Sequence, residues 1–175
     1  MTNLQSEFKH LMAACLMMGV CVAMGLPSAS ADASDDLNGL DIRPEDKADV
    51  CDPDIPQIRV DVFGVEPEGI LLVELYGDDT DHFLEREGRL RRTRVPASTS
   101  PQRVCINIDA PGTYAVASYH DQDGDRKLDK KWNRLPAEPF ALSTNPKLKL
   151  RKPRLNEAAF EAGVLGADIE LQLRD

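Results

Sequence analysis

Four aspartates at short intervals in the middle of the chain are the residues best suited to do chemistry. Their side-chain oxygens stand at the first, third, fifth and ninth positions of the segment that begins at residue 121. EF-hand loops present oxygen ligands to calcium in this order, with a backbone carbonyl at the seventh position. Carboxylates held so close repel one another, and a hard dication would relieve the repulsion. The four residues are Asp121, Asp123, Asp125 and Asp129.

The loop departs from the EF-hand pattern at two positions. Arg126 stands where glycine is needed, and Trp132 stands where a bidentate glutamate is needed. A calcium site here would therefore need a further ligand, either Glu138 or the acidic cluster at residues 78–81. The alternative is a solvated turn in which the aspartate side chains accept hydrogen bonds from local N–H groups. Calcium is the one cofactor that the sequence suggests, and both interpretations stay open.

His120 precedes the acidic loop and is the natural candidate for acid–base chemistry. Together with Asp121 and Glu138 it would form the centre of the alternative function, a hydrolase. However, the sequence contains no Gly-x-Ser-x-Gly elbow, no His-Glu-x-x-His pair and no glycine-rich phosphate loop. No set of nucleophile, base and orienting group can be named. We therefore expect a non-catalytic protein, in which His120 helps to fix the shape of the loop.

The first 31 residues have the layout of a secretory signal peptide. Residues 11–26 are sixteen residues without charge, fewer than the roughly 20 that span a bilayer, and an Ala-Ser-Ala cleavage site ends at Ala31. Cleavage there predicts a periplasmic or secreted protein with no transmembrane segment in the mature chain. The predicted organisation is a signal peptide (1–31), an acidic, proline-containing tail or linker ordered only near Cys51 (32–56) and a β-sandwich domain (57–175).

Charge and cysteine content narrow the class of protein further. The chain has 175 residues and a net charge of −9, which disfavours binding to nucleic acid. The length that remains after cleavage suits a single domain. Cys51 and Cys105 are the two cysteines beyond the leader, and an exported pair is usually bridged. The alternative is a pair of free buried thiols. A bridge would pin the N-terminal segment to the domain.

Short apolar runs with turn residues between them predict an all-β domain. Residues 66–69, Glu-Pro-Glu-Gly, are a turn signal, so we expect the first two strands to form a hairpin. A short helical turn is expected within residues 81–88. About seven strands with this spacing favour a single antiparallel β-sandwich of the Ig-like type. The expected strands are Gln57–Phe63, Ile70–Tyr76, Leu90–Val95, Val104–Ile108, Thr113–His120, Leu142–Arg151 and Ala167–Arg174.

The strand at residues 113–120 is preceded by a Pro-Gly turn and begins with a tyrosine. A tyrosine at this place is how many Ig-like sandwiches turn a corner, with the hydroxyl bonded to nearby backbone. Period-two alternation puts Tyr114, Val116, Ser118 and His120 on one face of the strand. Few residues of the strand are polar, so we expect it to be central in its sheet.

The segment from residue 111 to residue 145 resembles a bacterial family of exported proteins that is catalogued as a domain of unknown function. The resemblance covers about residues 57–174 and implies an Ig-like or transthyretin-like sandwich, but no activity. The chain differs from the family pattern at Arg134 and Ala141, where glycine is common. The residues that carry the resemblance are Gly112, Tyr114, His120, Asp121, Asp123, Asp125, Leu128, Asp129, Pro136, Glu138, Pro139, Ser143 and Asn145.

Ser143 and Asn145 close this segment, and we expect them to shape its loops together with Tyr114 and His120. The function that these observations favour is an exported, non-catalytic binding or interaction module of the cell envelope. Its partner would be an envelope protein or a glycan that binds the loops around residues 121–145. Aromatic residues are only 5% of the chain, which makes a large carbohydrate platform the weaker choice.

Two basic clusters stand out in this acidic chain. Because charge runs usually mark solvated faces, and because lysine on an edge strand prevents edge-to-edge pairing, we favour a protective role for them. The alternative is a site for an anionic envelope ligand, such as lipid phosphate or acidic polysaccharide. The clusters are Arg86, Arg89, Arg91, Arg92 and Arg94, and Lys147, Lys149, Arg151, Lys152 and Arg154.

Overall fold

Over the residues that it describes, the computed structural model contains eight strands and two short 3₁₀ turns, and it is all-β as predicted. The predicted signal peptide, the beginning of the predicted tail and Asp129 lie outside the residues that it describes. Within the described residues, no helix is long and apolar enough to cross a membrane. The described residues are 39–40, 42–127, 137–147, 149 and 151–175.

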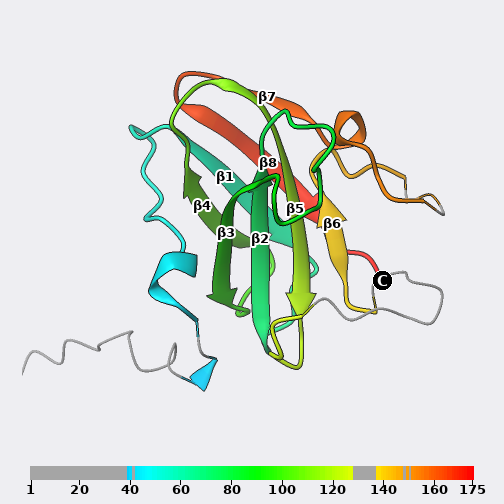
Figure 1. The fold of residues 1–175 in the computed structure, drawn as a ribbon. Helices are drawn as coiled ribbons and strands as arrows, with labels where there is room; N and C mark the ends of the chain where they lie inside the picture. The colour runs from blue at the N-terminus through cyan, green and yellow to red at the C-terminus, as the bar shows by residue number, and fades with distance from the viewer. Residues whose placement is uncertain (1–38, 41, 128–136, 148, 150) are drawn as a thin grey trace, which may run out of the picture. The chain divides into compact units, whose positions relative to one another are not determined.

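The strands form two sheets that pack face to face as a β-sandwich (Figure 1). The three-stranded sheet has the order β4-β1-β8. The five-stranded sheet has the order β3-β2-β5-β6, and β7 pairs with the beginning of β5. The strands are β1 (Gln57–Phe63), β2 (Ile70–Tyr76), β3 (Arg89–Pro96), β4 (Gln102–Asn107), β5 (Gly112–Asp121), β6 (Phe140–Leu142), β7 (Phe160–Ala162) and β8 (Gly166–Gln172).

The main core lies between the two sheets. In β2, Leu71, Val73 and Leu75 face the core, while β1 contributes Ile58 and two valines at the alternate positions that follow. This is the period-two pattern that the sequence predicts for half-buried strands. A second cluster, which includes Phe83 and Leu155, covers part of the outer face of the five-stranded sheet. The outer face of that sheet is therefore partly buried as well.

The predicted hairpin of the first two strands is wrong. β1 pairs with β4 and with β8, whereas β2 pairs with β3 and β5 in the other sheet. The connection at residues 64–69 carries the chain from one sheet to the other, with left-handed glycines at Gly64 and Gly69. A Cβ at Gly69 would lie 2.1 Å from the carbonyl oxygen of Asp121, so only glycine fits there. The turn signal was real, but a turn signal does not decide which strands pair.

Four smaller features of the structure also differ from the predictions. A strand is expected at residues 142–151, but β6 already ends at Leu142. The basic residues that follow are not in a strand. Residues 81–88 form turns rather than a helical turn. β7 has only three residues and was not predicted. The pairing of β1 with β8 is parallel, in a sandwich whose other strand pairs are antiparallel.

The predicted tail is expected to be ordered only near Cys51, but its ordered part begins earlier in the chain. The segment that contains the 3₁₀ turn η1 (Pro44–Asp46) lies beside β3 and β4 (Figure 1, cyan). Asp49 forms an isolated antiparallel bridge with Cys105 of β4. The side chains of Ile42 and Asp46 are buried. This packing depends on partners that are distant in sequence, so no local sequence pattern predicts it.

Candidate functional site at the end of β5

β5 is the central strand that delivers the acidic loop. It lies between β2 and β6, as its apolar composition predicts. The predicted alternation also holds, because Val116 faces the main core whereas Tyr119 and Asp121 lie on the outer side. The strand ends at Asp121, and Gly124 and Arg126 then adopt left-handed backbone conformations that turn the chain.

Within the loop, aspartate side chains accept hydrogen bonds from backbone N–H groups. The Asp121 carboxylate accepts from the N–H of Asp125 at 3.1 Å and from the N–H of Arg126 at 2.7 Å. Asp123 also accepts from the N–H of Asp125, at 3.1 Å. These are the contacts that the turn interpretation requires. They also hold the two carboxylates of Asp121 and Asp123 on the same side of the loop.

Glu138 joins these two carboxylates from the returning segment. One oxygen from each of Asp121, Asp123 and Glu138 lies within 4.8 Å of the others. Asp121 is 1% exposed and Glu138 is 9% exposed, whereas Asp123 is exposed. The N–H of His120 donates to the carbonyl of Pro139 at 2.9 Å, which fixes the returning strand beside β5. Three carboxylates at this separation form an arrangement that a hard cation can bridge.

The predicted ligand set is only partly brought together. Asp125 lies outside the three-carboxylate group, and its carboxylate accepts from the N–H and the Nζ of Lys127 at 2.8 and 3.0 Å. Asp129 lies outside the described residues. The cluster at residues 78–81 does not contribute a ligand to this group, and the Asp79 carboxylate is 2.8 Å from His82 Nδ1. Glu138 is the distant ligand that joins the loop.

The electrostatics of the group follow from its burial. Burial raises the pKa of the Asp121 carboxyl, the N–H groups of Arg126 and Gly124 oppose the rise, and the neighbouring Asp123 adds to it. The side chain of Lys127 lowers the pKa of Asp125. Like-charge crowding therefore acts on the pair of Asp121 and Asp123, while Asp125 is neutralised locally.

His120 does not face this group. Its side chain is 0% exposed and lies on the opposite side of β5 from Asp121. The Nε2–H donates to the carbonyl of Glu68 at 2.7 Å, and Nδ1 is buried without a hydrogen bond to any residue that the structure describes. Ser118 on the same face donates its hydroxyl to the carbonyl of Leu72 at 2.7 Å. Both side chains thus bond to backbone carbonyls of β2 and of the turn that precedes it.

Three further residues of the family-like segment have structural roles. The Tyr114 hydroxyl donates to the carbonyl of Ala110 at 2.7 Å, which is the predicted tyrosine corner. The Ser143 hydroxyl oxygen accepts from the N–H of Val116 at 2.8 Å and donates to the carbonyl of Ala158. Asn145 bonds to the backbone of β8 in the other sheet. Ser143 and Asn145 join segments that are distant in sequence, whereas the bond of Tyr114 is local.

Most arginines of the first basic cluster form ion pairs with carboxylates. Arg92 and Arg94 both contact the buried carboxylate of Asp46. Arg91 contacts Asp49 at 3.3 Å, and Arg89 contacts Glu74 on β2. The carboxylate that sequence reasoning missed is Asp46, which is 4% exposed. Nothing local marked it, because its partners lie 46 and 48 residues away.

The second basic cluster also has carboxylate partners. Lys149 and Arg151 contact Glu157 at 2.6 and 2.7 Å. Lys152 contacts Glu85 at 2.6 Å. These pairs are at the surface, where an ion pair contributes little to stability. They nevertheless leave less free positive charge for an anionic ligand than the sequence alone indicates.

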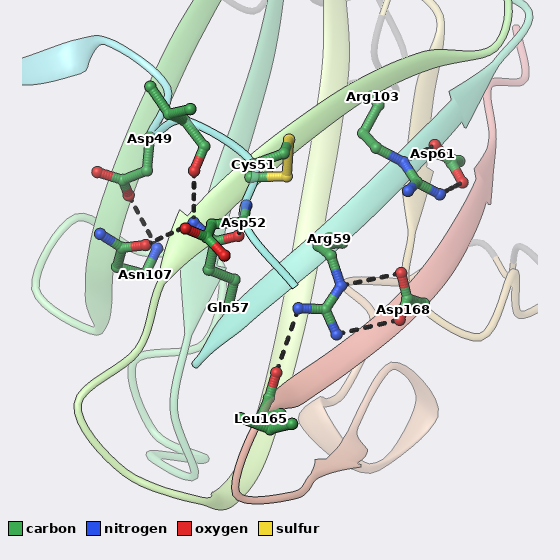
Figure 2. The surroundings of a disulfide bond; sticks show 12 residues. Asp49, Cys51, Asp52, Gln57, Arg59, Asp61, Arg103, Asn107, Leu165 and Asp168 are labelled. Atoms are coloured by element: carbon green, nitrogen blue, oxygen red, sulfur yellow. Dashed lines mark hydrogen bonds and ion pairs between the residues drawn. A yellow bond between two sulfur atoms is a disulfide. The ribbon is translucent and has the colours of Figure 1, made fainter. Parts of the chain in front are cut away.

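The predicted disulfide is present, and it connects Cys51 to Cys105 with a Cα–Cα distance of 5.3 Å. Figure 2 shows the bridge beside a buried glutamine at the beginning of β1. Gln57 donates from Nε2 to the carbonyl of Val50 at 2.8 Å and to Asn107 Oδ1 at 2.7 Å. These bonds fix the segment next to Cys51. A disulfide fits a protein outside the cytoplasm.

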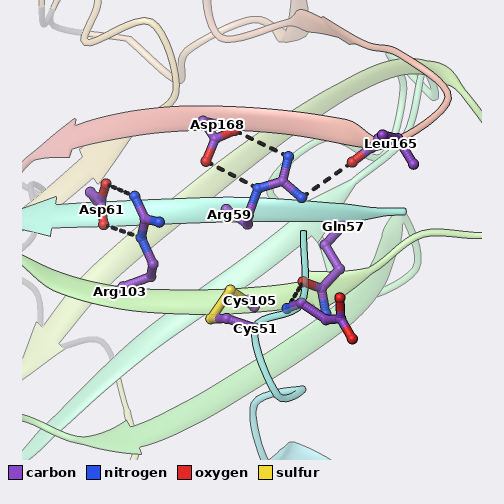
Figure 3. A network of polar contacts seen from close by, with 9 residues as sticks. Cys51, Gln57, Arg59, Asp61, Arg103, Cys105, Leu165 and Asp168 are labelled. Atoms are coloured by element: carbon purple, nitrogen blue, oxygen red, sulfur yellow. Dashed lines mark hydrogen bonds and ion pairs between the residues drawn. A yellow bond between two sulfur atoms is a disulfide. The ribbon is translucent and has the colours of Figure 1, made fainter. Parts of the chain in front are cut away.

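The exposed face of the three-stranded sheet carries two cross-strand ion pairs (Figure 3). Arg59 of β1 binds Asp168 of β8 with both contacts near 3 Å. Asp61 of β1 accepts from Arg103 of β4 at 2.8 Å. Each of these two arginines has a carboxylate partner on this face. The arrangement is that of a solvated face with balanced charge, rather than of a site for a charged ligand.

Comparison with known proteins gives one result. A family model described as an uncharacterized protein conserved in bacteria (DUF2141) matches residues 60–169. Comparisons with curated proteins and with solved structures found no significant match. The matched range includes the acidic loop, Glu138, Ser143 and Asn145.

Proposed function

Because the chain belongs to this family of uncharacterized bacterial proteins, whose description names no activity, we propose a function from the site alone. We propose that the protein is an exported, non-catalytic binding module of the cell envelope whose acidic loop binds calcium. The loop would present its surface to an envelope protein or a glycan. Calcium would fix the shape of that surface.

One observation carries the proposal, which is the convergence of Asp121, Asp123 and Glu138 within 4.8 Å. Calcium takes six to eight oxygen ligands, which include carboxylates, backbone carbonyls and water. Three carboxylates supply the charge that such a site needs, and carbonyls and water would supply the remaining ligands. Two of the three side chains are at most 9% exposed, so their charges interact with each other and with a cation more strongly than they would in bulk water.

Export is supported by two independent features. The N-terminal sequence has the layout of a signal peptide, and the domain contains a disulfide. Outside the cytoplasm, calcium modules typically bind with dissociation constants of about 10⁻⁴ to 10⁻³ M. A site with three carboxylates and a loop already ordered by hydrogen bonds suits affinity in this range.

The non-catalytic role is supported by the surroundings of the one candidate base. His120 is buried on the core side of β5 and is hydrogen-bonded to Glu68. The nearby hydroxyl of Ser118 is bonded to a backbone carbonyl. Neither group faces the carboxylates of Asp121 and Glu138, so His120 and Ser118 do not form a nucleophile–base pair beside the acidic group.

Thermal melting with and without calcium tests the proposal. Protein purified from the periplasm after expression of the full chain should melt at a higher temperature in calcium than in chelator. At a free calcium concentration a hundredfold above the dissociation constant, linkage allows about 2.7 kcal/mol of stabilisation. Asp123→Asn and Glu138→Gln should each lose the increase in melting temperature. Asp125→Asn is the matched control, because its carboxylate is occupied by Lys127 and lies outside the group.

Two results would overturn the proposal. The first is an identical melting temperature for the wild-type protein in calcium and in chelator. The second is a calcium-dependent increase that survives in both Asp123→Asn and Glu138→Gln, because the ion would then bind elsewhere. In either case the loop would be a hydrogen-bonded turn held by Asp121.

A further inference from the structure

The segment of residues 42–51, called the strap below, runs beside β3 and β4 before the chain enters β1 (Figure 1). It is held at three places. Asp46 pairs with Arg92 and Arg94 of β3. Asp49 donates its N–H to the carbonyl of Cys105 at 3.0 Å. Cys51 forms the disulfide with Cys105, beside which Figure 2 shows Asp49.

The contact between the strap and β3 is polar and incompletely satisfied. Three arginines, at positions 91, 92 and 94, face two strap carboxylates. The Nε atoms of Arg91 and Arg94 are buried and have no hydrogen-bond partner among the described residues. Buried ion pairs of this kind add little net stability, and each unsatisfied buried donor has a cost. The strap therefore depends on its covalent attachment more than on this contact.

The disulfide that attaches the strap is accessible to a reductant from solvent. Cys51 is exposed, whereas Cys105 is buried with 0% exposure. A thiolate of a dithiol reductant can attack the Cys51 sulfur, which breaks the disulfide and releases Cys105 as a thiolate that takes up a proton. The second thiol of the reductant then displaces Cys51 and closes its own disulfide. The products are two cysteine thiols and the oxidised reductant.

The strap side of the molecule also reaches the acidic loop. Just before the strap, Leu40 lies close to the loop, since a Cβ placed on Gly124 would lie 3.8 Å from Leu40 Cδ2. The strand register gives a second connection. Leu72 of β2 pairs with Arg94 on one side and with Tyr119 on the other, so these three side chains form a row on the outer face. The neighbouring row contains Asp121.

We propose that the Cys51–Cys105 bridge makes the strap a redox-controlled clamp on the acidic loop. With the bridge intact, the strap holds Asp46 against β3 and Leu40 against Gly124, and the loop stays ordered. Reduction releases the strap, and the loop loses order and with it the affinity for calcium. The last step rests on the proposed function, whereas the loosening of the loop does not.

Hydrogen exchange of the purified protein, with the bridge intact or reduced by dithiothreitol, tests the clamp. Mass spectrometry first establishes that the bridge is broken. Reduction should accelerate exchange of the strap amides and, by about tenfold, of the amides of Asp125 and Arg126, which the loop carboxylates hold. The Cys51→Ser/Cys105→Ser variant should behave like the reduced protein. A calcium titration of both forms should show a weaker dissociation constant on reduction.

A pair of charge variants provides a matched control. Asp46→Asn removes the carboxylate that holds Arg92 and Arg94, and it should accelerate exchange in the acidic loop, most strongly after reduction. Asp168→Asn removes the same charge from the exposed pair with Arg59 on the other sheet, and it should exchange like the wild type (Figure 3). If Asp46→Asn does not fold, hydrogen exchange of the oxidised and reduced wild-type protein tests the clamp by itself.

The outcomes separate the two proposals. If the oxidised protein shows no response to calcium, the proposed function fails, and the exchange experiment still tests the clamp. If reduction leaves exchange in the acidic loop unchanged, the clamp is overturned, whether or not calcium binds. Equal acceleration in Asp46→Asn and Asp168→Asn would also overturn it, because the effect would then come from net charge alone.

Discussion

Asp49 and Asn145 close the two opposite edges of the same three-stranded sheet, each with one side chain. On β4, the Asp49 carboxylate accepts from the N–H of Asn107 at 2.8 Å. On β8, Asn145 donates from Nδ2 to the carbonyl of Glu170 at 2.9 Å and accepts at Oδ1 from the N–H of Gln172 at 2.7 Å. Each side chain occupies backbone groups that would otherwise be open to pairing with another chain.

Replacement of Asn145 by alanine should therefore weaken the sandwich at its β8 edge. Asn145→Ala removes both hydrogen bonds and should lower the free energy of unfolding by about 1–3 kcal/mol. Urea denaturation followed by circular dichroism measures the change. Asn156→Ala, at an exposed asparagine, is the control and should stay within about 0.5 kcal/mol of the wild type. If Asn145→Ala changed the free energy of unfolding by less than about 0.5 kcal/mol, the role assigned to the amide would be contradicted.

Features that depend on local pattern could be predicted from the sequence. Short apolar runs located β2 at Ile70–Tyr76 and located β5 to within one residue at each end. The Pro-Gly-x-Tyr sequence predicted the bond from Tyr114 to nearby backbone. The pairing of Cys51 with Cys105 followed from the number of cysteines beyond the leader. In each case, the information lies within a few residues or in a simple count.

Features that depend on tertiary packing could not be predicted. The turn at residues 66–69 is compatible with a hairpin and with a crossing between sheets, and only the packing of β1 between β4 and β8 decides between them. Asp46 looked like one of several acidic residues in a tail, because its arginine partners are far along the chain. Within the acidic segment, four similar aspartates gave no sign that Asp125 would pair with Lys127 while Asp121 and Asp123 meet Glu138.

The tyrosine corner allows a test of a single hydrogen bond. Tyr114→Phe retains the aromatic ring and removes the hydroxyl that donates to the carbonyl of Ala110 at 2.7 Å. The free energy of unfolding should fall by about 0.5–1.5 kcal/mol, the usual contribution of such a bond. Chemical denaturation of the wild-type and variant proteins under identical conditions measures the difference. An unchanged midpoint would show that the hydroxyl is equally well solvated in the unfolded chain and that the corner does not depend on it.

The disulfide should form in the exported protein and should stabilise it. Non-reducing peptide mapping by mass spectrometry of protein from the periplasm should recover Cys51 and Cys105 as one linked peptide pair. The two residues are 54 positions apart, and the chain-entropy model gives about 4 kcal/mol of stabilisation for a loop of this length. The double variant Cys51→Ser/Cys105→Ser should therefore unfold at a clearly lower urea concentration. Recovery of both cysteines in alkylated form without prior reduction would disprove the bridge.

Asp121 should make calcium binding and apo stability depend on pH in opposite directions. Burial raises the pKa of this carboxyl in the folded protein above its ordinary value of 3.8. The protonated form is therefore favoured by folding, so the contribution of Asp121 to apo stability is fully present below 3.8 and is lost as the pH rises through the raised pKa. Calcium instead requires the ionised carboxylate, so protons compete with the ion in the same interval.

Two measurements follow from this sign. In chelator, the stability of the wild-type protein relative to Asp121→Asn should increase as the pH falls through the raised pKa of Asp121 towards 3.8. In calcium, the ion-dependent increase in melting temperature should shrink over the same interval. Carbon NMR of the Asp121 carboxyl, recorded in chelator, gives the midpoint directly. A midpoint below 3.8 would mean that the N–H groups of Arg126 and Gly124 outweigh burial, and both pH effects would then reverse or shift to more acidic solution.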